Sequence, residues 1–496
     1  MSVASLVDAR AVAEPRGRAV ADASRSLSNR ELADRVAAAA MHLDHLGIAR
    51  GNVVALRLRN RVEFVVVLYA AWSLGAAVTP INPSLTATEV ERQLHDSGAR
   101  LLVTERGAPP VTVATLQIDE LPTTPGEAPM VAAPADPGAL ALVVYTSGTT
   151  GAPKGVMLDH ANIDSMTSMC RRDLELTPAD RCLLVLPLFH VNGIIVSVLT
   201  PLLAGASVVM VERFDPATFF AKVRDERPTY FSAVPTIFGI LDALPADAAF
   251  DTSSVRFAVC GAAPAPRDLL ARFQNRYDVP VLEGYGLSEG TCATTINPVS
   301  GARRAGTVGP AMAGQDLRIC GPDGTDVPPG QQGEILVRGP NVMRGYLGRP
   351  EATAEVLVDG WLHTGDLGSL DADGYLTLSG RAKDLIIRGG ENISPKEIED
   401  VIAGEPAVQE VAVVGAPDER WGEVVVAVVQ PRPGFDIDIA ALQARCAQQL
   451  AGYKRPTTYT VVAHMPKTPV GKIDKQALRS VGRSLPAPTT EPTTPL

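Results

Sequence analysis

The run YTSGTTGAPKG, residues 145–155, directly follows the apolar segment Leu140 to Val144. It contains five hydroxyl residues, three glycines and one lysine, Lys154. A buried strand that ends in such a loop presents backbone N–H groups, hydroxyl donors and a mobile cation, which together suit a polyphosphate. The lysine follows Pro153, so the spacing is not that of a P-loop. The alternative is a flexible linker, which is also rich in Ser, Thr and Gly but needs neither a lysine nor a buried strand before it.

The composition is that of a globular protein of several domains. The chain has 496 residues, of which 46% are hydrophobic and 20% charged, and its formal net charge is -10. This negative balance argues against nucleic acid or an anionic membrane as the main partner. A nucleotide can still bind such a chain through a local cationic site.

The sequence predicts a cytoplasmic protein without a transmembrane segment. Residues 1–18 carry five charged side chains and no apolar core of a signal peptide. The longest apolar stretch, Val62 to Leu74, contains Glu63 and is too short to span a bilayer. The six cysteines are scattered singly, without metal or redox spacing, which favours reduced thiols.

As far as Cys260 the chain alternates helix and strand signals. Ser28 and Glu31 form a capping box for a helix that ends at Gly47. A strand is then predicted over Val53–Leu56 and a buried helix over Val62–Leu74. Repeated units of this kind predict an α/β fold of mostly parallel sheets covered by helices.

The pattern changes twice towards the C-terminus. From Gly306 to Ser379 short strands alternate with Gly- and Pro-rich turns, which predicts a small, barrel-like β region. Beyond Arg381 helices and strands of an α+β unit follow, and the Pro- and Thr-rich end has almost no apolar residues. We therefore expect a large N-terminal domain over residues 1–380, a small mobile C-terminal lid over 381–483 and a disordered tail over 484–496.

Two further runs carry candidate nucleotide ligands. In GYGLSE, residues 284–289, the aromatic Tyr285 could stack on a purine, and Glu289 could anchor Mg2+ beside phosphates. In WLHTGD, residues 361–366, Asp366 could grip ribose hydroxyls. Taken alone, each acid could equally cap an ordinary turn.

Two runs near the end of the chain complete the set. The junction GRAKD, residues 380–384, leads through an apolar strand to GGENISP, residues 389–395. In TPVGKI, residues 468–473, Lys472 follows a glycine, where a lysine by itself would be a solvated surface residue. The five runs in this order resemble the adenylate-forming superfamily of acyl-CoA synthetases, adenylation domains and luciferases. The resemblance extends from about Leu27 to Leu478, and its most specific parts are the 145–155 loop and the 380–393 junction.

The resemblance implies a role for each matching residue. The β- and γ-phosphates of ATP would be held by Thr146, Ser147, Gly148, Thr149, Thr150 and Lys154, with Ser288 as a further phosphate contact and Glu289 as the Mg2+ ligand. The adenine would be framed by Gly261, Ala262, Ala263, Glu283, Gly284, Tyr285 and Gly286. Asp366 would take the ribose hydroxyls beside Arg381, and Lys472 would bridge the attacking carboxylate and the α-phosphate. Where the superfamily more often has threonine, this chain has Ser288, which keeps the hydroxyl.

The resemblance also implies a second step. Lys383 would be the hinge about which the lid rotates after adenylation, and Gly389 and Gly390 would line the tunnel for a pantetheine thiol. His190, in PLFHVNG, would be a gate between acid pocket and tunnel; a general base is the alternative. We favour the gate because a thiol of ordinary pKa needs little help to displace an acyl phosphate.

The predicted function is that of a carboxylic acid:CoA ligase that uses ATP, Mg2+ and coenzyme A and releases AMP. The acid pocket is expected from residues 191–196, 232–238, 261–263 and 284–286, which contain no arginine for a second carboxylate. An aliphatic or aromatic monocarboxylic acid is therefore favoured. Two alternatives stay open: an adenylating enzyme that serves an amine or a carrier-protein thiol, and a non-catalytic nucleotide-binding protein.

Overall fold

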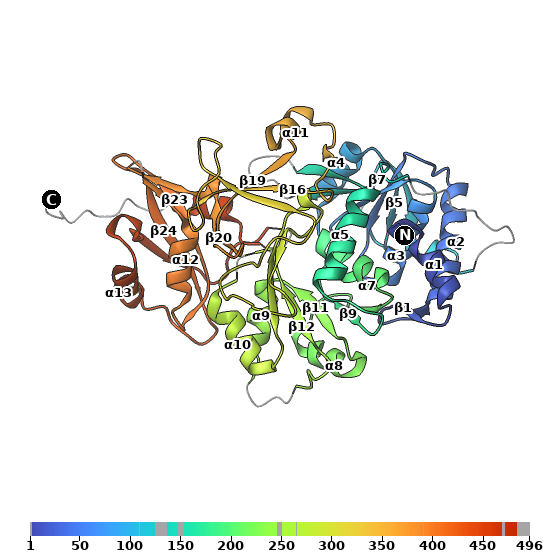
Figure 1. Cartoon of the computed structure of the whole chain (residues 1–496), viewed down its shortest axis with the longest axis horizontal. Coiled ribbons are helices and arrows are strands. Elements are labelled where there is room, and N and C mark those ends of the chain that lie inside the picture. The colour runs from blue at the N-terminus through green and yellow to red at the C-terminus, as the bar shows by residue number, and fades with distance from the viewer. Residues whose placement is uncertain are drawn as a thin grey trace.

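The structure is a computed structural model, which describes residues 2–108, 110–124, 136–146, 153–245, 250–263, 265–389, 391–468 and 472–483. The molecule is elongated, with the blue N-terminal elements at one end and the orange and red C-terminal elements at the other (Figure 1). The yellow strands β16 (Gly333–Arg338) and β19 (Trp361–Leu370) lie between these two ends. The expectations about Ser147, Gly148, Thr149, Thr150, Gly390 and the tail 484–496 concern residues outside the described ranges.

One sheet is built around the strand that precedes the phosphate loop. Its order is β17 (Gly345–Tyr346), β8 (Lys154–Asp159), β7 (Leu140–Thr146), β4 (Ala77–Pro80), β3 (Val53–Arg57), β5 (Ala99–Thr104) and β6 (Ala114–Gln117). From β7 to β6 neighbouring strands are parallel. The edge formed by β8 and β17 is antiparallel, so the chain returns after the loop as a hairpin. The sequence rhythm did not reveal this reversal, because β8 directly follows the loop without a crossover helix.

A second sheet holds most of the other predicted strands. Its order is β14 (Thr295–Ile296), β13 (Val281–Tyr285), β12 (Phe257–Cys260), β11 (Tyr230–Ala233), β9 (Arg181–Leu184), β10 (Ser207–Met210), β1 (Arg18–Ala21) and β2 (Ser26–Ser28). The strands from β13 to β1 are parallel, and only the outer pairs are antiparallel. The prediction of mostly parallel, helix-covered sheets is thus confirmed.

Helices fill the space between the two sheets and cover their outer faces. Helix α3 (Val62–Ser73) is apolar on all sides and buried along nearly its whole length, as expected for a helix inside a core. With α2 (Asn29–His45) and α5 (His160–Asp173) it joins the largest apolar cluster, which includes residues of both sheets. The capping boxes Ser28–Glu31 and Thr86–Glu89 begin α2 and α4 (Ala87–Ser97) as the sequence predicts.

The other N-terminal helices pack in or against two apolar clusters. They are α1 (Leu6–Ala13), α6 (Val191–Ile194), a π-helical turn (Ile195–Leu199), α7 (Thr200–Leu203), α8 (Pro216–Glu226), α9 (Pro235–Asp242), α10 (Arg267–Tyr277) and α11 (Pro350–Val356). Helices α1, α6, the π-helical turn and α7 contribute buried residues to the largest cluster, and α8, α9 and α10 to a second one. Among them, α8, α9 and α10 pack on the second sheet through an aromatic cluster that includes Phe219, Phe238 and Phe273.

The predicted small β region is an antiparallel sheet of β15 (Asp316–Cys320), β16, β19, β18 (Leu357–Val358) and β20 (Leu376–Arg381). The C-terminal sheet consists of β22 (Glu391–Ile393), β21 (Ile386–Arg388), β24 (Gly422–Pro431), β23 (Val408–Asp418) and β25 (Thr458–Val461). One face packs on α12 (Pro395–Ala403) and α13 (Ile439–Gln449), and the other contacts α14 (Lys475–Arg483). Apolar residues on both faces give this unit its own core, in agreement with a separate small domain.

The six cysteines are free and buried, in agreement with the expected reduced thiols. Among the described residues no helix has the length and apolar character needed to cross a membrane.

Candidate active site

Two of the predicted adenine loops lie side by side. Gly261–Ala263 follow β12, and Glu283–Gly286 end β13, its parallel neighbour, so both meet at the carboxyl edge of the second sheet. A Cβ on Gly261 would lie 3.5 Å from the carbonyl oxygen of Gly284. Ala262 has a left-handed backbone (φ +69°), a conformation that costs free energy for a residue with a side chain and that is common at functional sites.

Gly286 is required by packing within the protein. A Cβ there would lie 1.8 Å from the carbonyl oxygen of Cys292, so a side chain would force the backbone apart. The next residues, Ser288–Gly290, form one 3-10 turn that carries Ser288 and Glu289. Thr291 and Cys292 follow with φ of +64° and +148°, so the turn with the candidate metal ligand is held in a strained backbone.

Tyr285, the aromatic residue predicted to frame the adenine, has a hydrogen-bond partner within the protein. Its side chain is buried among the apolar residues between the sheets, and its hydroxyl donates to Asp366 Oδ2 at 2.6 Å. Burial and the Asp366 charge raise the pKa of Tyr285 well above its usual value, so the phenol keeps its proton and remains a donor. The structure therefore adds a task that sequence reasoning missed, the orientation of Asp366.

Asp366 is fixed from several sides. It is 7% exposed and lies opposite Arg381 in the β19–β20 pair, and the Arg381 Nε donates to Asp366 Oδ1. The turn that carries it is held by Glu334, whose Oε1 accepts from the Gly365 N–H at 3.0 Å. A carboxylate held in this way keeps a constant direction, which suits an acceptor for two neighbouring hydroxyls.

The phosphate side combines Thr146, Lys154, Glu289 and Ser288. Thr146 ends β7 and pairs with Lys154, which begins β8. The Lys154 Nζ lies 4.7 Å above the ring of Tyr346, and the hydroxyl of Tyr346 donates to Glu289 Oε1 at 2.8 Å. One tyrosine thus contacts both the candidate phosphate lysine and the candidate metal ligand, and no sequence spacing indicated this.

Lys472 reaches this site from the C-terminal part of the chain. Its ammonium is close enough to Arg381, Asp366 and Glu289 for their charges to act on it. Part of the Lys472 side chain remains exposed to solvent, although protein atoms surround its ammonium closely enough to desolvate it. Desolvation and the Arg381 charge lower the pKa of Lys472, and the two carboxylates oppose this effect. Lys472 is therefore not the remote surface lysine that the run TPVGKI would be when taken alone.

His190 lies close to the same lysine. Desolvation, with a smaller effect of the Lys472 charge, lowers the pKa of His190 to about 4. Its ring packs against Phe189 with ring centroids 4.4 Å apart. The imidazole is consequently neutral at physiological pH and a weak proton acceptor.

The junction residues lie at the base of the C-terminal unit. Lys383 belongs to a 3-10 turn, Ala382–Asp384, directly after β20, and burial beside Arg381 lowers the pKa of Lys383. Gly389 has φ +58°, and a Cβ on it would lie 2.9 Å from the ring of Trp421. Trp421 is 41% exposed, and the guanidinium groups of Arg388 and Arg420 lie 5.5 Å and 4.9 Å from the centre of its ring.

Asn60, which the sequence did not single out, anchors the loop before His190. It is 5% exposed, its Nδ2 donates to the carbonyls of Leu186 and Val211, and its Oδ1 accepts from the Leu188 N–H at 2.8 Å. Asn60 therefore ties the end of β3 in one sheet to the ends of β9 and β10 in the other.

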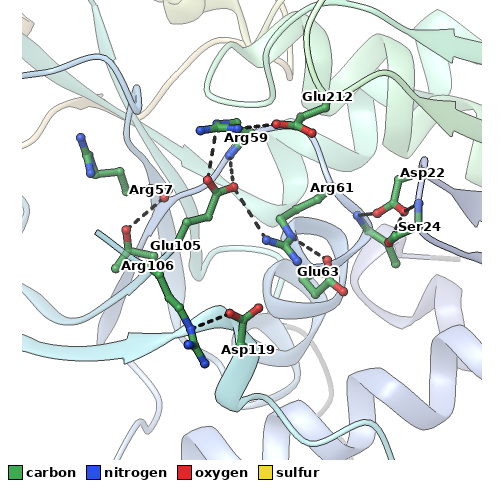
Figure 2. A network of polar contacts seen from close by, with 12 residues as sticks. Asp22, Ser24, Arg57, Arg59, Arg61, Glu63, Glu105, Arg106, Asp119 and Glu212 are labelled. Carbon is green, nitrogen blue, oxygen red and sulfur yellow. Dashed lines mark hydrogen bonds and ion pairs between the residues drawn. The ribbon is translucent and has the colours of Figure 1, made fainter. Parts of the chain in front are cut away.

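Charged neighbours hold Asn60 in place. Figure 2 shows Arg59 between Glu105 and Glu212, and Arg61 beside Glu63. Backbone amides on both sides of Asn60 are also held, because Arg59 N donates to Glu105 and Val62 N to Asp22 (Figure 2).

We expect Asn60→Ala to lower the free energy of unfolding by about 3 kcal/mol, because it leaves buried backbone groups without partners. Chemical denaturation of both proteins measures this. Asn52→Ala is the matched control: it removes a bond to the Ala49 N–H in an exposed turn, and we expect a loss below about 1 kcal/mol. Equal losses in the two variants would contradict the anchoring role.

The comparisons with known proteins agree with this geometry. Residues 7–347 match the AMP-binding enzyme family, and residues 397–472 match the AMP-binding enzyme C-terminal domain. A feruloyl-CoA synthase from Amycolatopsis is 40% identical over 480 residues, which cover 95% of this chain and 97% of the relative. A sulfoacetate–CoA ligase from Cupriavidus necator is 38% identical over 450 residues, 87% of this chain and 88% of the relative.

Solved structures give the same result. The o-succinylbenzoate CoA synthetase of Bacillus subtilis, in complex with its acyl-adenylate intermediate, superposes with a TM-score of 0.88 at 31% identity. The match covers 96% of this chain and 97% of that structure. The chain therefore belongs to the AMP-binding enzyme family, in its acyl-CoA synthetase branch.

Proposed function

We propose that this enzyme joins a small carboxylic acid to coenzyme A in two steps at one nucleotide site. In the first, a carboxylate oxygen attacks the α-phosphorus of ATP, the bond to the β-phosphate breaks, and acyl-AMP and pyrophosphate form. In the second, the CoA thiol attacks the acyl carbonyl and AMP leaves. One observation carries the proposal: Asp366, held by Tyr285 and Arg381, and Glu289, held by Tyr346, both lie within electrostatic range of Lys472 from the C-terminal part of the chain.

In the first step, each of these residues would act through its charge. Asp366, held by Arg381 and Tyr285, would accept the ribose hydroxyls, and Lys154 would balance the terminal phosphates. Lys472 would meet the charge that develops between carboxylate and α-phosphate. Reactions at phosphorus depend on such placed charges more than on covalent help from the protein.

Glu289 fits the role of the Mg2+ ligand. Its Oε1 accepts from Tyr346, while in the described parts of the chain its Oε2 carries no hydrogen bond. Mg2+ is commonly held by one or two carboxylates together with phosphate oxygens. The ion would neutralise phosphate charge at this point.

The acid pocket is proposed along residues 191–196, 232–238, 261–263 and 284–286. These segments are mainly apolar and contain no arginine, which favours a monocarboxylic aliphatic or aromatic acid. Two buried polar atoms there, Asn192 Oδ1 and Ser232 Oγ, have no partner among the described residues. An acid with a hydroxyl or N–H group would satisfy them better than a plain hydrocarbon chain.

For the second step we propose that the lid turns about Lys383 and brings Gly389 and Gly390 to the thiol. The exposed Trp421, with two arginines near its ring, is suited to a nucleotide, because the ring can stack on a base and the cations can pair with phosphates. We propose the cytoplasm as the place of action, where ATP and CoA are available.

We expect His190 to act as a gate and not as a base, since an imidazole with a pKa near 4 does not change its charge between about pH 5.5 and about pH 8. The pH profile of thioester formation from added acyl-AMP should therefore have the same shape for the wild type and for His190→Phe over this range. If the wild-type rate showed a pH-dependent step near pH 6.5 that His190→Phe lacks, the general-base role of His190 would be favoured.

Exchange of labelled pyrophosphate into ATP across a panel of acids tests the first step. Silence with every acid would favour a non-catalytic nucleotide-binding protein. The acceptor is tested by adding CoA, a holo-carrier protein or an amine to the active acid. Product formation only with the carrier protein or the amine would replace CoA in the proposal.

A further inference from the structure

Tyr346 connects two parts of the phosphate site that are far apart in sequence. Its ring lies under the Lys154 ammonium, at 4.7 Å, and its hydroxyl donates to Glu289 Oε1 at 2.8 Å. Tyr346 itself is 7% exposed. A buried phenol beside a carboxylate remains protonated, because burial and the Glu289 charge both raise its pKa.

The backbone around Tyr346 is attached to both partners. β17 pairs with β8, with Tyr346 opposite Val156, and the Leu347 N–H donates to the Gly155 carbonyl at 2.8 Å. This register holds Tyr346 next to the start of β8, where Lys154 lies. Gly345 allows the approach: its φ is +137°, and a Cβ there would lie 2.6 Å from Thr353 Cγ2.

The same segment also holds the turn with Glu289. The Met343 N–H donates to the Glu289 carbonyl at 2.8 Å. The fully buried Asn341 donates from Nδ2 to the Gly290 carbonyl at 2.8 Å, and its own carbonyl accepts from the Thr291 hydroxyl. Residues 341–347 thus connect strand β8 to a turn whose backbone is strained, and a strained turn persists only where its surroundings hold it.

We propose that Tyr346 is a positioning residue that sets the place of Glu289 relative to Lys154, and so the binding of the magnesium–polyphosphate part of ATP. This inference rests on the proposed function. The hydroxyl fixes one Glu289 oxygen, so the other would be available to hold the cation, while the ring keeps Lys154 beside it. AMP has neither the β- nor the γ-phosphate, so its affinity should not depend on Tyr346.

The test is calorimetric binding to the full-length protein without acid, so that ATP is not consumed. The probes are ATP with Mg2+, ATP with EDTA, and AMP. Tyr346→Phe keeps the ring but removes the hydroxyl, and we expect the Kd of ATP with Mg2+ to rise about tenfold, with a smaller change in EDTA and none for AMP. Tyr346→Leu also removes the contact with Lys154, and should weaken ATP both with Mg2+ and in EDTA.

Two controls make the result specific. Tyr277→Phe removes another buried hydroxyl, which donates to the Leu241 carbonyl, and should leave all three affinities unchanged. In a double-mutant cycle, Tyr346→Phe should have little further effect on ATP with Mg2+ when Glu289 is already alanine, which removes the acceptor of the hydroxyl. This cycle reports whether the hydroxyl acts through Glu289.

The outcomes are distinct. Wild-type affinity of Tyr346→Phe for ATP with Mg2+, or an equal loss for AMP, would overturn the positioning role while leaving the proposed function intact. A full effect of Tyr346→Phe in the Glu289→Ala background would overturn the link through Glu289. A wild type that binds neither ATP nor AMP would overturn the proposed function and this inference together.

Discussion

Lys472→Ala should lower the rate of acyl-adenylate formation about 1,000-fold while leaving the thiolysis of supplied acyl-adenylate largely intact. Lys472 is the cation that stands beside Asp366 and Glu289, and a placed charge of this kind contributes two to three orders of magnitude. Since the ammonium would act on charge that develops during the reaction, the loss should appear in kcat more than in KM. Pyrophosphate release measures the first step, and thioester formation from added acyl-AMP measures the second.

The matched control is Lys467→Ala. Lys467 lies in the same part of the chain and pairs with Glu410 at the surface, so its removal should change neither step. An equal loss of both steps in Lys472→Ala would mean that the lysine supports the fold or both reactions, and that the two half-reactions do not use different faces of the lid.

Lys383→Pro should have the opposite effect. Lys383 lies in a 3-10 turn, whose typical φ is close to the angle that proline imposes, so the observed arrangement with Lys472 at the site should be retained. Rotation of the lid requires a different backbone angle at the hinge, and proline would oppose it by about 3 kcal/mol, or about 100-fold in the rate of thioester formation. Adenylation should remain within a few-fold of the wild type.

Lys383→Ala is the control, because it removes the same side chain but leaves the backbone free. Lys383→Ala should retain the wild-type rates of both adenylation and thioester formation. The Ser394 hydroxyl, which donates to the Ser379 carbonyl across the junction, would have to release this bond during rotation. If Lys383→Pro and Lys383→Ala behave alike in thioester formation, the pivot lies elsewhere.

Much of the fold could be predicted because its signals are local. The Ser28–Glu31 and Thr86–Glu89 boxes begin helices where expected, since a cap satisfies N–H groups within its own turn. The apolar run from Val62 also gave a local signal: its composition leaves no polar face, which predicted a buried helix. The antiparallel return of β8 and the short strand β17 were missed, because they depend on pairing with distant strands.

For the candidate site, too, the sequence indicated the charged residues but not the side chains that orient them. The five runs named most of the residues that carry charge, and the structure brings Lys154, Glu289, Asp366, Arg381 and Lys472 into one region. Tyr285 was expected at the adenine, yet its hydroxyl holds Asp366. Tyr346 and Asn60 were not singled out at all, because a lone tyrosine or asparagine has no distinctive spacing.

The sequence by itself determined the family, the parallel α/β architecture and the charged groups, because motifs and hydrophobic periods are properties of neighbouring residues. Only the tertiary structure decided which side chains orient those groups. Tyr346 reaches Glu289 across 57 positions, Tyr285 reaches Asp366 across 81 and Asn60 reaches Leu188 across 128. Hydrogen bonds over such separations depend on how sheets pack and strands register, which no local pattern encodes.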